Sequence, residues 1–367
     1  MLMQNNIFKF KMLADVMQNK SDAFTFIRFF AALLVLYAHS YHIFGLGADP
    51  LSSRIGFYTG TLAVYIFFTI SGFFILQSAI KRTFIEYTVA RLARIFPGLI
   101  VANIITIFII IPAAEKLYIV DFISKTSSWE YIKTNSFLET VTFTLPGIFV
   151  NHPDQAINGS LWTLPVEVRA YISSLFFVAL GITVTRARYN AAFILLILIN
   201  SLFPDFFKNI FPIPGSLSLM FFFCIGGLLY INRNHIPVSP LLTLVSLGLL
   251  IYYRNHLNSL FIPILVGYII ISIGYLFGFI RLLNLKHDYS YGLYLYAYPV
   301  SQLSFSLLSE RGFAIYFVFI CCVTFAVAIL SWHCVEKPIA SFARVRIVPY
   351  LSSLAKRFNM INVRDNL

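Results

Sequence analysis

The sequence predicts an all-α integral membrane protein with about ten transmembrane helices. Only 11% of its 367 residues are charged and 59% are hydrophobic, whereas about a quarter of the residues in a soluble domain are charged. The hydrophobic residues form repeated runs of about 20, the length of a helix that spans a bilayer. The net charge of +12 is spread between these runs rather than gathered in one patch. This pattern is typical of cytoplasmic loops, so we expect membrane lipid around the chain and no nucleic-acid partner.

Ten apolar runs are predicted to cross the membrane, and no appended soluble domain is expected. The predicted spans are residues 24–45, 56–79, 95–113, 160–181, 190–206, 215–231, 238–253, 257–279, 289–308 and 313–334. The long connection 114–159 is too polar to span, and a short re-entrant or surface helix is expected around residues 137–150. No internal repeat is evident.

The distribution of Lys and Arg predicts that both termini are cytoplasmic. With the N-terminus inside, 18 of the 27 Lys and Arg residues fall on the inner side, as the positive-inside rule requires. Residues 1–22 are then a cytoplasmic segment without a cleavable signal peptide. Residues 23–338 form the membrane domain, and residues 339–367 form a basic, moderately amphipathic tail on the inner leaflet.

The first predicted span contains two ionisable side chains, Arg28 and His39. They are 11 residues apart, about 20° from a whole number of helical turns, so both are expected on one face, about 16 Å apart along the axis. Each alone has an ordinary explanation, an arginine that reaches the interface and a histidine bonded to a neighbouring helix. Because ionisable groups inside lipid are costly, their shared face favours a polar pathway through the bundle.

Arg91 and Arg94 form a basic pair before the third predicted span. Residues three apart are neighbours on a helix, and two guanidinium groups suit phosphate because each can bind it bidentately. Simple flanking of a membrane span by positive charge is the alternative. Pro97 is predicted to mark the entry to the span.

Residues 158–171 open the fourth predicted span and contain Glu167. Asn158 offers cap chemistry, and Pro165 interrupts the local hydrogen-bond ladder. Counting about 1.5 Å per residue from the outer end places Glu167 about 10 Å deep, close to the depth of about 8–9 Å predicted for His39. An intramembrane carboxylate usually lines a cavity, and a structural pair with His or Arg is the alternative.

Other polar side chains in the predicted spans are less specific. Ser71 is a candidate lining residue of a polar cavity, whereas Gly72 is expected to serve helix packing. The tyrosines of residues 287–300, with Tyr294 among them, are explained in part by an interfacial belt and in part as donors into a polar cavity.

Three further groups are expected to be structural. The loop with His152 and Asp154 is predicted to be solvated rather than to meet substrate. His333, Glu336 and Lys337 are predicted to mark the inner end of the last membrane helix. The four cysteines lie in apolar segments without metal-ligand spacing, so no metal site is predicted.

Six of these motifs, in order, resemble the membrane-bound acyltransferase-3 family from about residue 22 to about residue 340. They are Arg28 with His39 eleven residues later, SGFF at 71–74, RLARIFP at 91–97, GSLWTLPVEVRAY at 159–171, SYGLYLYAYPV at 290–300 and EKP at 336–338. The resemblance implies ten membrane helices and O-acylation, mostly O-acetylation, of extracytoplasmic glycans.

The resemblance also implies roles for particular residues. His39 would be the catalytic residue and Arg28 its essential partner. Arg91 and Arg94 would help to bind an acyl-coenzyme A donor from the cytoplasm.

On the acceptor side, the resemblance places Glu167 and Trp162 in the catalytic or acceptor cavity. The family often has histidine where this chain has Tyr298, so no role is carried over to that position.

Together these inferences predict transfer of an acetyl group from cytoplasmic acetyl-coenzyme A, as cosubstrate, across a bacterial inner membrane. The acceptor would be a hydroxyl of an extracytoplasmic carbohydrate or glycolipid, such as O-antigen or exopolysaccharide. His39 would act as general base and Glu167 would orient it, with an acetyl-histidine intermediate as an alternative. Two other classes stay open: a transporter or flippase of a lipid-linked glycan, and a non-catalytic scaffold.

Overall fold

The structure is a computed structural model that describes residues 10–18, 22–124, 126–138, 140–253, 261–280, 283 and 285–357. Among the basic residues used to predict the orientation, Lys9, Lys20, Lys125, Arg254, Arg281 and Arg364 lie outside the described residues. The chain divides into two compact units. The first contains residues 1–31, 62–82 and 166–288, and the second contains residues 32–61, 83–165 and 289–367.

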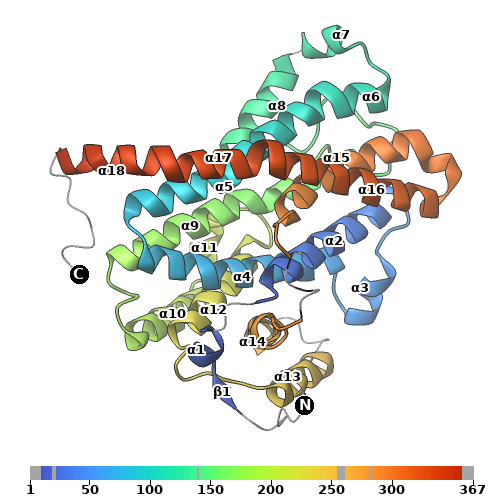
Figure 1. Ribbon diagram of the computed structural model, residues 1–367. Coiled ribbons are helices and arrows are strands. Elements are labelled where there is room, and N and C mark those ends of the chain that lie inside the picture. The colour runs from blue at the N-terminus through green and yellow to red at the C-terminus, as the bar shows by residue number, and fades with distance from the viewer. Residues whose placement is uncertain are drawn as a thin grey trace. The chain divides into compact units, whose positions relative to one another are not determined.

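Three helices pass from one unit to the other along the chain (Figure 1). They are α2 (Phe24–Ile43), α4 (Thr59–Lys81) and α9 (Thr163–Ala179). The remaining elements of the first unit are β1 (Lys11–Met12), α1 (Leu13–Val16), α10 (Arg186–Leu202), α11 (Pro204–Ile210), α12 (Ser216–Ile231), β2 (Pro237–Val238), α13 (Pro240–Tyr252) and α14 (Phe261–Leu276).

The second unit holds the other helices. They are α3 (Pro50–Ile55), α5 (Phe84–Ile105), η1 (Thr106–Ile110), α6 (Ile111–Glu115), α7 (Ile119–Ile123), α8 (Thr126–Phe137), η2 (Gly159–Trp162), α15 (Ser290–Leu308), η4 (Ser309–Arg311), α16 (Phe313–Ser331), η5 (Trp332–Glu336), α17 (Lys337–Phe342), η6 (Ala343–Ile347) and α18 (Val348–Arg357).

The predicted helical class is confirmed, and each of the ten predicted spans overlaps a helix. Among the described residues, five helical stretches are long and apolar enough to cross a membrane. They are Phe24–Ile43, Thr59–Lys81, Phe84–Glu115, Gly159–Ala179 and Phe313–Arg357. Ten crossings and the absence of a soluble domain stay predictions.

In the first unit, small residues bring α4 and α12 into backbone contact. A Cβ atom on Gly72 would overlap the carbonyl oxygen of Phe223, and one on Gly226 would overlap that of Thr69. The predicted packing role of Gly72 is therefore confirmed. A short antiparallel pairing, Lys11 with Val238, joins β1 to β2.

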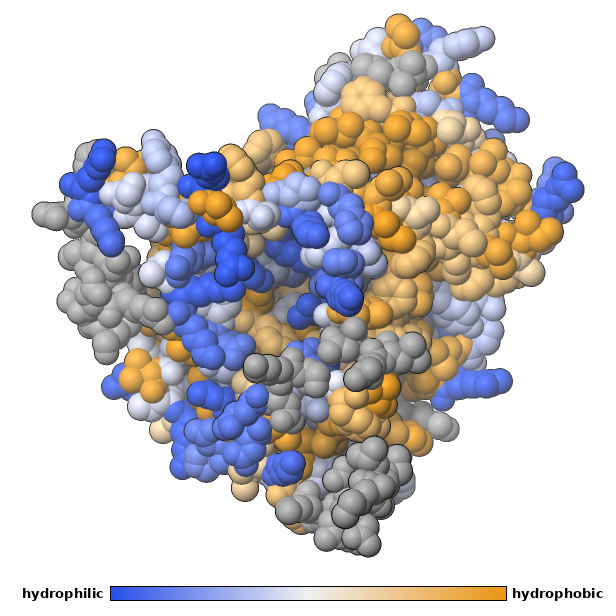
Figure 2. Space-filling model, viewed as in Figure 1, coloured by the Kyte–Doolittle hydropathy of each residue, from blue (hydrophilic) through white to orange (hydrophobic). Residues whose placement is uncertain are grey.

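In the second unit, α15 is the central buried helix. Residues 290–302 are all buried, although the segment contains many tyrosines. A Cβ atom on Gly292 would lie 2.9 Å from the Cα atom of Ala328, so α15 and α16 pack closely at this point. Hydrophobic side chains cover the outer surface of α16 (Figure 2), as expected of a helix that faces lipid.

Three expectations about the helices are wrong. The third long helix starts at Phe84 rather than near Pro97, because Thr83 and Glu86 form a capping box and α5 continues through the proline. The long connection holds the helices α7 and α8, whereas residues 140–150 form turns, bends and irregular backbone rather than the predicted helix.

The last helix also does not end near Glu336. It continues to Arg357 through the π-helical turns η5 and η6. Pro338 lies in the first turn after η5, where its missing N–H is tolerated because the wider π-helical turn interrupts the regular ladder.

Candidate active site

His39 lies half-buried on the part of α2 that belongs to the second unit, with two tyrosines beside its ring. The Tyr58 hydroxyl oxygen is 3.4 Å from His39 Nδ1. The Tyr298 ring makes an edge contact, with the ring centroids 4.9 Å apart. If Nδ1 carries the proton, it donates to the Tyr58 oxygen and leaves Nε2 as an acceptor. An imidazole held in this way can take up a proton at Nε2, as a general base must.

The position of Tyr58 depends on the buried N-cap residue of α3, Asp49. Its carboxylate accepts hydrogen bonds from the Ser52 backbone N–H at 3.0 Å, from the Thr59 hydroxyl at 2.7 Å and from the Ser52 hydroxyl. Burial alone would raise the pKa of Asp49, but these hydrogen bonds outweigh burial and hold the pKa below its usual value. Because Thr59 directly follows Tyr58, the network fixes the tyrosine beside His39.

Asp154, in the loop before η2, binds two side chains near His39. The Tyr298 hydroxyl donates to Asp154 Oδ2, and His42 Nε2 lies 3.2 Å from the same oxygen. The other oxygen, Oδ1, accepts from the Ala156 backbone N–H at 2.9 Å. The Asp154 side chain is 18% exposed and that of His42 is 57% exposed. The loop is therefore solvated only in part: Asn151, Pro153 and Gln155 are exposed, whereas protein donors satisfy the Asp154 carboxylate.

His152 is likewise held by protein contacts. Its Nδ1 is 2.6 Å from Gln302 Oε1, its Nε2 is 3.0 Å from the Ser306 hydroxyl, and its ring stacks on Phe149. Gln302 Nε2 also donates to the carbonyl oxygen of Asp154 at 2.7 Å. The loop is thus attached along α15 at several points.

One face of α15 carries Tyr291, Tyr294 and Tyr298, which we call the tyrosine stripe. Their spacing of three and four residues places them on one side of the helix. The predicted lining residue Tyr294 donates its hydroxyl to the Ser160 carbonyl oxygen at 2.7 Å and lies 2.6 Å from Thr163 Oγ1. Its hydroxyl therefore attaches α15 to the segment that starts α9.

The turn η2 packs directly on the last tyrosine of the stripe. A Cβ atom on Gly159 would lie 2.6 Å from the Tyr298 ring, so only glycine fits there without displacing the ring. Asn158 Nδ2 donates to the Leu295 carbonyl oxygen at 2.9 Å. Trp162, predicted to belong to the cavity, is the half-buried last residue of this turn.

The first tyrosine of the stripe meets Arg94 on α5. Arg94 Nη1 lies 3.2 Å from Glu336 Oε2, and Glu336 Oε1 accepts from the Ser331 hydroxyl at 3.0 Å. The guanidinium also lies over the rings of Tyr291 and Trp332, 5.2 and 5.9 Å from their centroids. This neighbourhood holds a partly buried cation between a carboxylate and two aromatic faces.

Arg91 is half-buried three residues before Arg94 on the same helix. The predicted basic pair thus lies on a helix, as expected, but inside the long helix α5 rather than before its start. Its binding of a donor stays a prediction.

In the first unit, Arg28 Nη1 forms an ion pair with Asp288 Oδ2 at 3.2 Å. Its guanidinium also lies 5.8 Å from the centroid of the Phe74 ring. Arg28 and His39 are both on α2, as predicted, and the helix separates them by about 16 Å along its axis.

Glu167 and Ser71 also belong to the first unit. The Tyr171 hydroxyl, one turn further along α9, donates to the Glu167 carboxylate. Ser71 is half-buried on α4. The predicted common depth of Glu167 and His39 stays a prediction.

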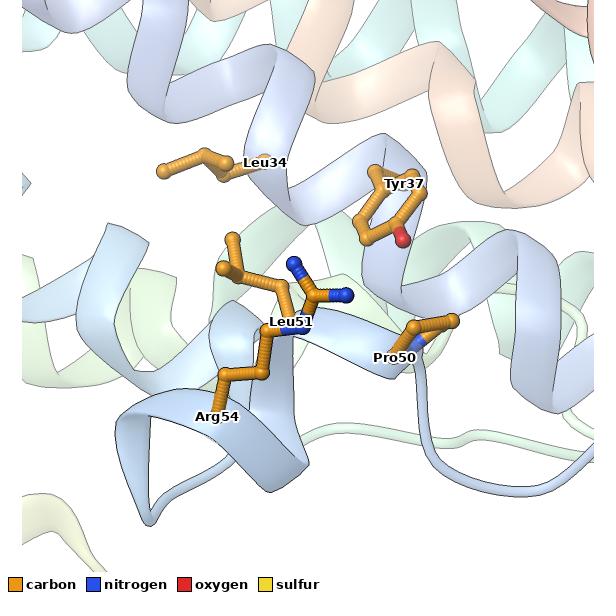
Figure 3. Close-up of a pocket in the computed structure, with 5 residues that line it drawn as sticks. All are labelled: Leu34, Tyr37, Pro50, Leu51 and Arg54. Carbon is orange, nitrogen blue, oxygen red and sulfur yellow. The ribbon is translucent and has the colours of Figure 1, made fainter.

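A pocket of about 400 Å³ lies between α2 and α3. It is lined by Leu34, Tyr37, Pro50, Leu51 and Arg54, and the Arg54 guanidinium projects toward α2 (Figure 3). Tyr37 and His39 are two residues apart, about 200° around the helix, so the pocket and the His39 ring lie on different sides of α2. No predicted site residue lines this pocket.

Five contributors were not predicted as site residues: Tyr58, His42, Asp154, Asp288 and Glu336. A partly buried arginine needs an acidic partner, and this rule could have pointed to the acidic residues beside the ninth and tenth predicted spans. Tyr58 and Asp154 lie in loops, and only the Asp-Pro helix start of α3 gave a local signal near them. Among the described residues, no three His, Cys, Asp or Glu side chains form a group that could hold a metal ion.

Comparison with known proteins adds independent evidence. Residues 21–333 match the family described as an acyltransferase domain, the acyltransferase-3 family. The chain is 32% identical to an O-acetyl transferase of Shigella phage Sf6 over 346 residues, which cover 87% of this chain and 96% of that protein. It is also 31% identical to nodulation protein 10 of Rhizobium leguminosarum bv. viciae over 156 residues, 41% of this chain and 42% of that protein. No solved structure gives a significant match.

Proposed function

The chain belongs to the acyltransferase-3 family, and from this premise we propose that it transfers an acetyl group from acetyl-coenzyme A to a hydroxyl of an extracytoplasmic carbohydrate. The similarity to the phage O-acetyl transferase along most of both chains supports acetyl as the group and oxygen as the acceptor atom. The apolar helices and the family place the protein in a membrane. We further propose that this is the bacterial inner membrane, with both termini cytoplasmic.

The observation that carries this proposal is the tyrosine stripe of α15, which runs between two chemically different neighbourhoods. Tyr291 contacts the cation Arg94, and Tyr298 contacts the imidazole His39. The two tyrosines are seven residues apart, about 10 Å along the helix. A donor with phosphates at one end and a thioester at the end of a long, thin arm can reach from a cation to a base at this separation.

In this proposal the Arg94 neighbourhood, with Arg91 on the same helix, receives the phosphate groups of the donor. Guanidinium groups bind phosphate through paired, charge-assisted hydrogen bonds. Glu336 holds Arg94 in place, and an incoming phosphate competes with that carboxylate for it.

His39 acts as the general base. Its Nε2 takes the proton of the acceptor hydroxyl while the hydroxyl oxygen attacks the thioester carbonyl carbon. The carbon–sulfur bond then breaks, and the proton passes from His39 to the leaving thiolate. The products are the acetyl ester and free coenzyme A, so no net proton is taken up or released.

Tyr58 keeps the His39 ring in this orientation by accepting from Nδ1–H, the task that a carboxylate performs in a serine-protease triad. We propose that Glu167 and Arg28 act in the same reaction. Glu167 serves on the acceptor side. Arg28, which its ion pair with Asp288 holds in place, is the essential partner of His39 on α2. Ser71 and Trp162 are proposed lining residues of the acceptor path. A covalent acetyl-His39 intermediate is the alternative chemical route.

The test uses the purified chain in proteoliposomes with acetyl-coenzyme A and a host surface glycan. Release of free thiol and the mass of the acetylated glycan are followed together. We expect both products with the wild type and neither with His39→Ala, and equal membrane insertion of the two proteins.

A transporter would move the glycan without consuming acetyl-coenzyme A, so no thiol release by the wild type would overturn the proposal. Full product with His39→Ala would remove His39 from the mechanism. Burst-phase labelling of the protein by radioactive acetyl groups would favour the covalent route.

A further inference from the structure

Three segments that are far apart in the sequence meet at the carboxylate of Asp154. His42 comes from α2, Tyr298 comes from α15, and Asp154 lies in the loop before η2. Both side chains contact the same oxygen, Oδ2, while Oδ1 is bound to the backbone of Ala156. The backbone contact fixes the carboxylate in one orientation.

We propose that Asp154 is a positioning residue of the transfer reaction. Its carboxylate holds the Tyr298 ring against His39, and it holds His42 at the more exposed side of the same neighbourhood. This inference rests on the proposed acetyl transfer, because it assigns parts of that site.

Tyr298 is the first of the two side chains that Asp154 holds. The side chain is 2% exposed, and a buried hydroxyl without a partner is costly. The ring is confined between the His39 ring, 4.9 Å away between centroids, and the backbone of Gly159. If Asp154 no longer accepts its proton, the hydroxyl must find another partner, and the ring can move only by disturbing His39.

His42 is the second side chain that Asp154 holds. It lies three residues after His39, so the two imidazoles are on neighbouring parts of one helix face, about 4.5 Å apart along the axis. His42 is the more exposed of the two. With Nε2 directed to Asp154 Oδ2, its Nδ1 stays available to a hydroxyl. A saccharide that approaches His39 from the exposed side therefore meets His42 first.

The test compares Asp154→Asn, Tyr298→Phe and His42→Gln with a control, Asp121→Asn, which changes an exposed carboxylate on α7. We expect Tyr298→Phe to lower kcat about tenfold with an unchanged acceptor KM, the effect expected of one lost hydrogen bond. His42→Gln should raise the acceptor KM by a similar factor with little change in kcat. Asp154→Asn should show both effects, and Asp121→Asn neither.

Combining substitutions tests whether Tyr298 acts through Asp154. The double variant Asp154→Asn with Tyr298→Phe should have the kcat of Asp154→Asn alone, because residues that act as a unit are not additive. A further tenfold loss in the double variant would overturn the proposal.

A readout without turnover separates this proposal from the proposed function. Carbethoxylation of His42 by diethylpyrocarbonate, followed by mass spectrometry, reports how accessible its ring nitrogens are. Labelling should be several-fold faster in Asp154→Asn than in the wild type and unchanged in Asp121→Asn. Equal labelling in all three overturns the Asp154–His42 contact, whereas the expected labelling in a protein that transfers no acetyl overturns only the reaction.

Discussion

The neighbourhoods of His39 and Arg94 lie at the two ends of one tyrosine stripe and are built from different kinds of partner. Around His39 the direct contacts are with the neutral side chains of Tyr58 and Tyr298. Around Arg94 the direct contact is with Glu336, a carboxylate that is 3% exposed. The two ends therefore differ in where the charge lies.

This difference fits two different tasks. A general base must gain and lose a proton, so partners that do not fix its charge leave both of its states accessible. A cation that binds phosphate must stay charged and correctly placed in a poorly polar environment, which a buried carboxylate and aromatic faces provide. Substitutions at either the His39 end or the Arg94 end of the tyrosine stripe therefore test the two tasks separately.

The largest effect is expected from Arg94→Ala. Losing one charge-assisted contact to a donor phosphate should raise the KM for acetyl-coenzyme A about 100-fold, with a much smaller change in the acceptor KM. Steady-state kinetics in proteoliposomes measures both. Arg311→Ala, which removes an exposed arginine on η4, is the control and should leave the donor KM unchanged. An unchanged donor KM in Arg94→Ala would end the assignment of this end to the donor.

Two glycine substitutions provide a matched pair, one at each end of the stripe. Gly159→Ala would place a Cβ atom 2.6 Å from the Tyr298 ring, and Gly98→Ala would place one 3.0 Å from the Tyr291 ring. Overpacking of this kind costs about 1–3 kcal/mol and shifts the neighbouring side chains. We expect Gly159→Ala to lower kcat and Gly98→Ala to raise the donor KM.

The control for this pair is Gly248→Ala on α13, where no atom lies within 4 Å of the added Cβ atom. It should keep wild-type kinetics and raise the free energy of unfolding by up to about 1 kcal/mol, because alanine is the better helix former. Kinetic changes of the same kind in Gly159→Ala and Gly98→Ala would show that the two ends do not have separate tasks.

Tyr58→Phe should lower kcat about tenfold, since phenylalanine cannot accept a hydrogen bond from Nδ1–H of His39. The donor KM should not change. Tyr118→Phe, at a side chain that is 84% exposed, controls for the loss of a tyrosine hydroxyl. Wild-type kcat in Tyr58→Phe would mean that another group orients the imidazole.

The smallest effect is expected from Asp49→Asn, seen only as a function of pH. Hydrogen bonds hold the pKa of Asp49 below its usual value, so the ionised form stabilises the folded protein. That contribution is complete above the unfolded pKa of about 4 and is lost as the pH falls through the lower folded pKa. Between pH 5 and about 3, Asp49→Asn should therefore lose less stability than the wild type, as measured by thermal unfolding in detergent. Identical pH dependence would contradict the assignment.

Much of the helical architecture could be predicted from the sequence, because apolar runs of membrane length have few alternatives to a helix. The errors occurred where local signals competed. Pro97 alone suggests a helix boundary. The helix instead starts at the capping box of Thr83 and Glu86, which lie 14 and 11 residues before the proline. The helix after Ser331 continued because a π-helical turn precedes Pro338, a feature with no simple sequence pattern.

The site was less predictable than the fold. Tyr294 and the basic pair of α5 could be selected as candidates from the sequence, because polar and charged side chains stand out within apolar runs, and their roles stay predictions. Tyr58 and Asp154 are not predicted as site residues, since loops bring Tyr58 to His39 across 19 residues of sequence and Asp154 to Tyr298 across 144. Contacts over such separations depend on tertiary packing, which a periodic pattern does not encode.

The most direct test of a base at one end and a donor site at the other is to measure coenzyme A binding and acetyl transfer in His39→Ala and Arg94→Ala side by side. The account predicts that His39→Ala binds coenzyme A with the wild-type Kd in isothermal titration but transfers no acetyl, whereas Arg94→Ala binds it about 100-fold more weakly. Loss of coenzyme A binding in His39→Ala together with normal binding in Arg94→Ala would contradict it.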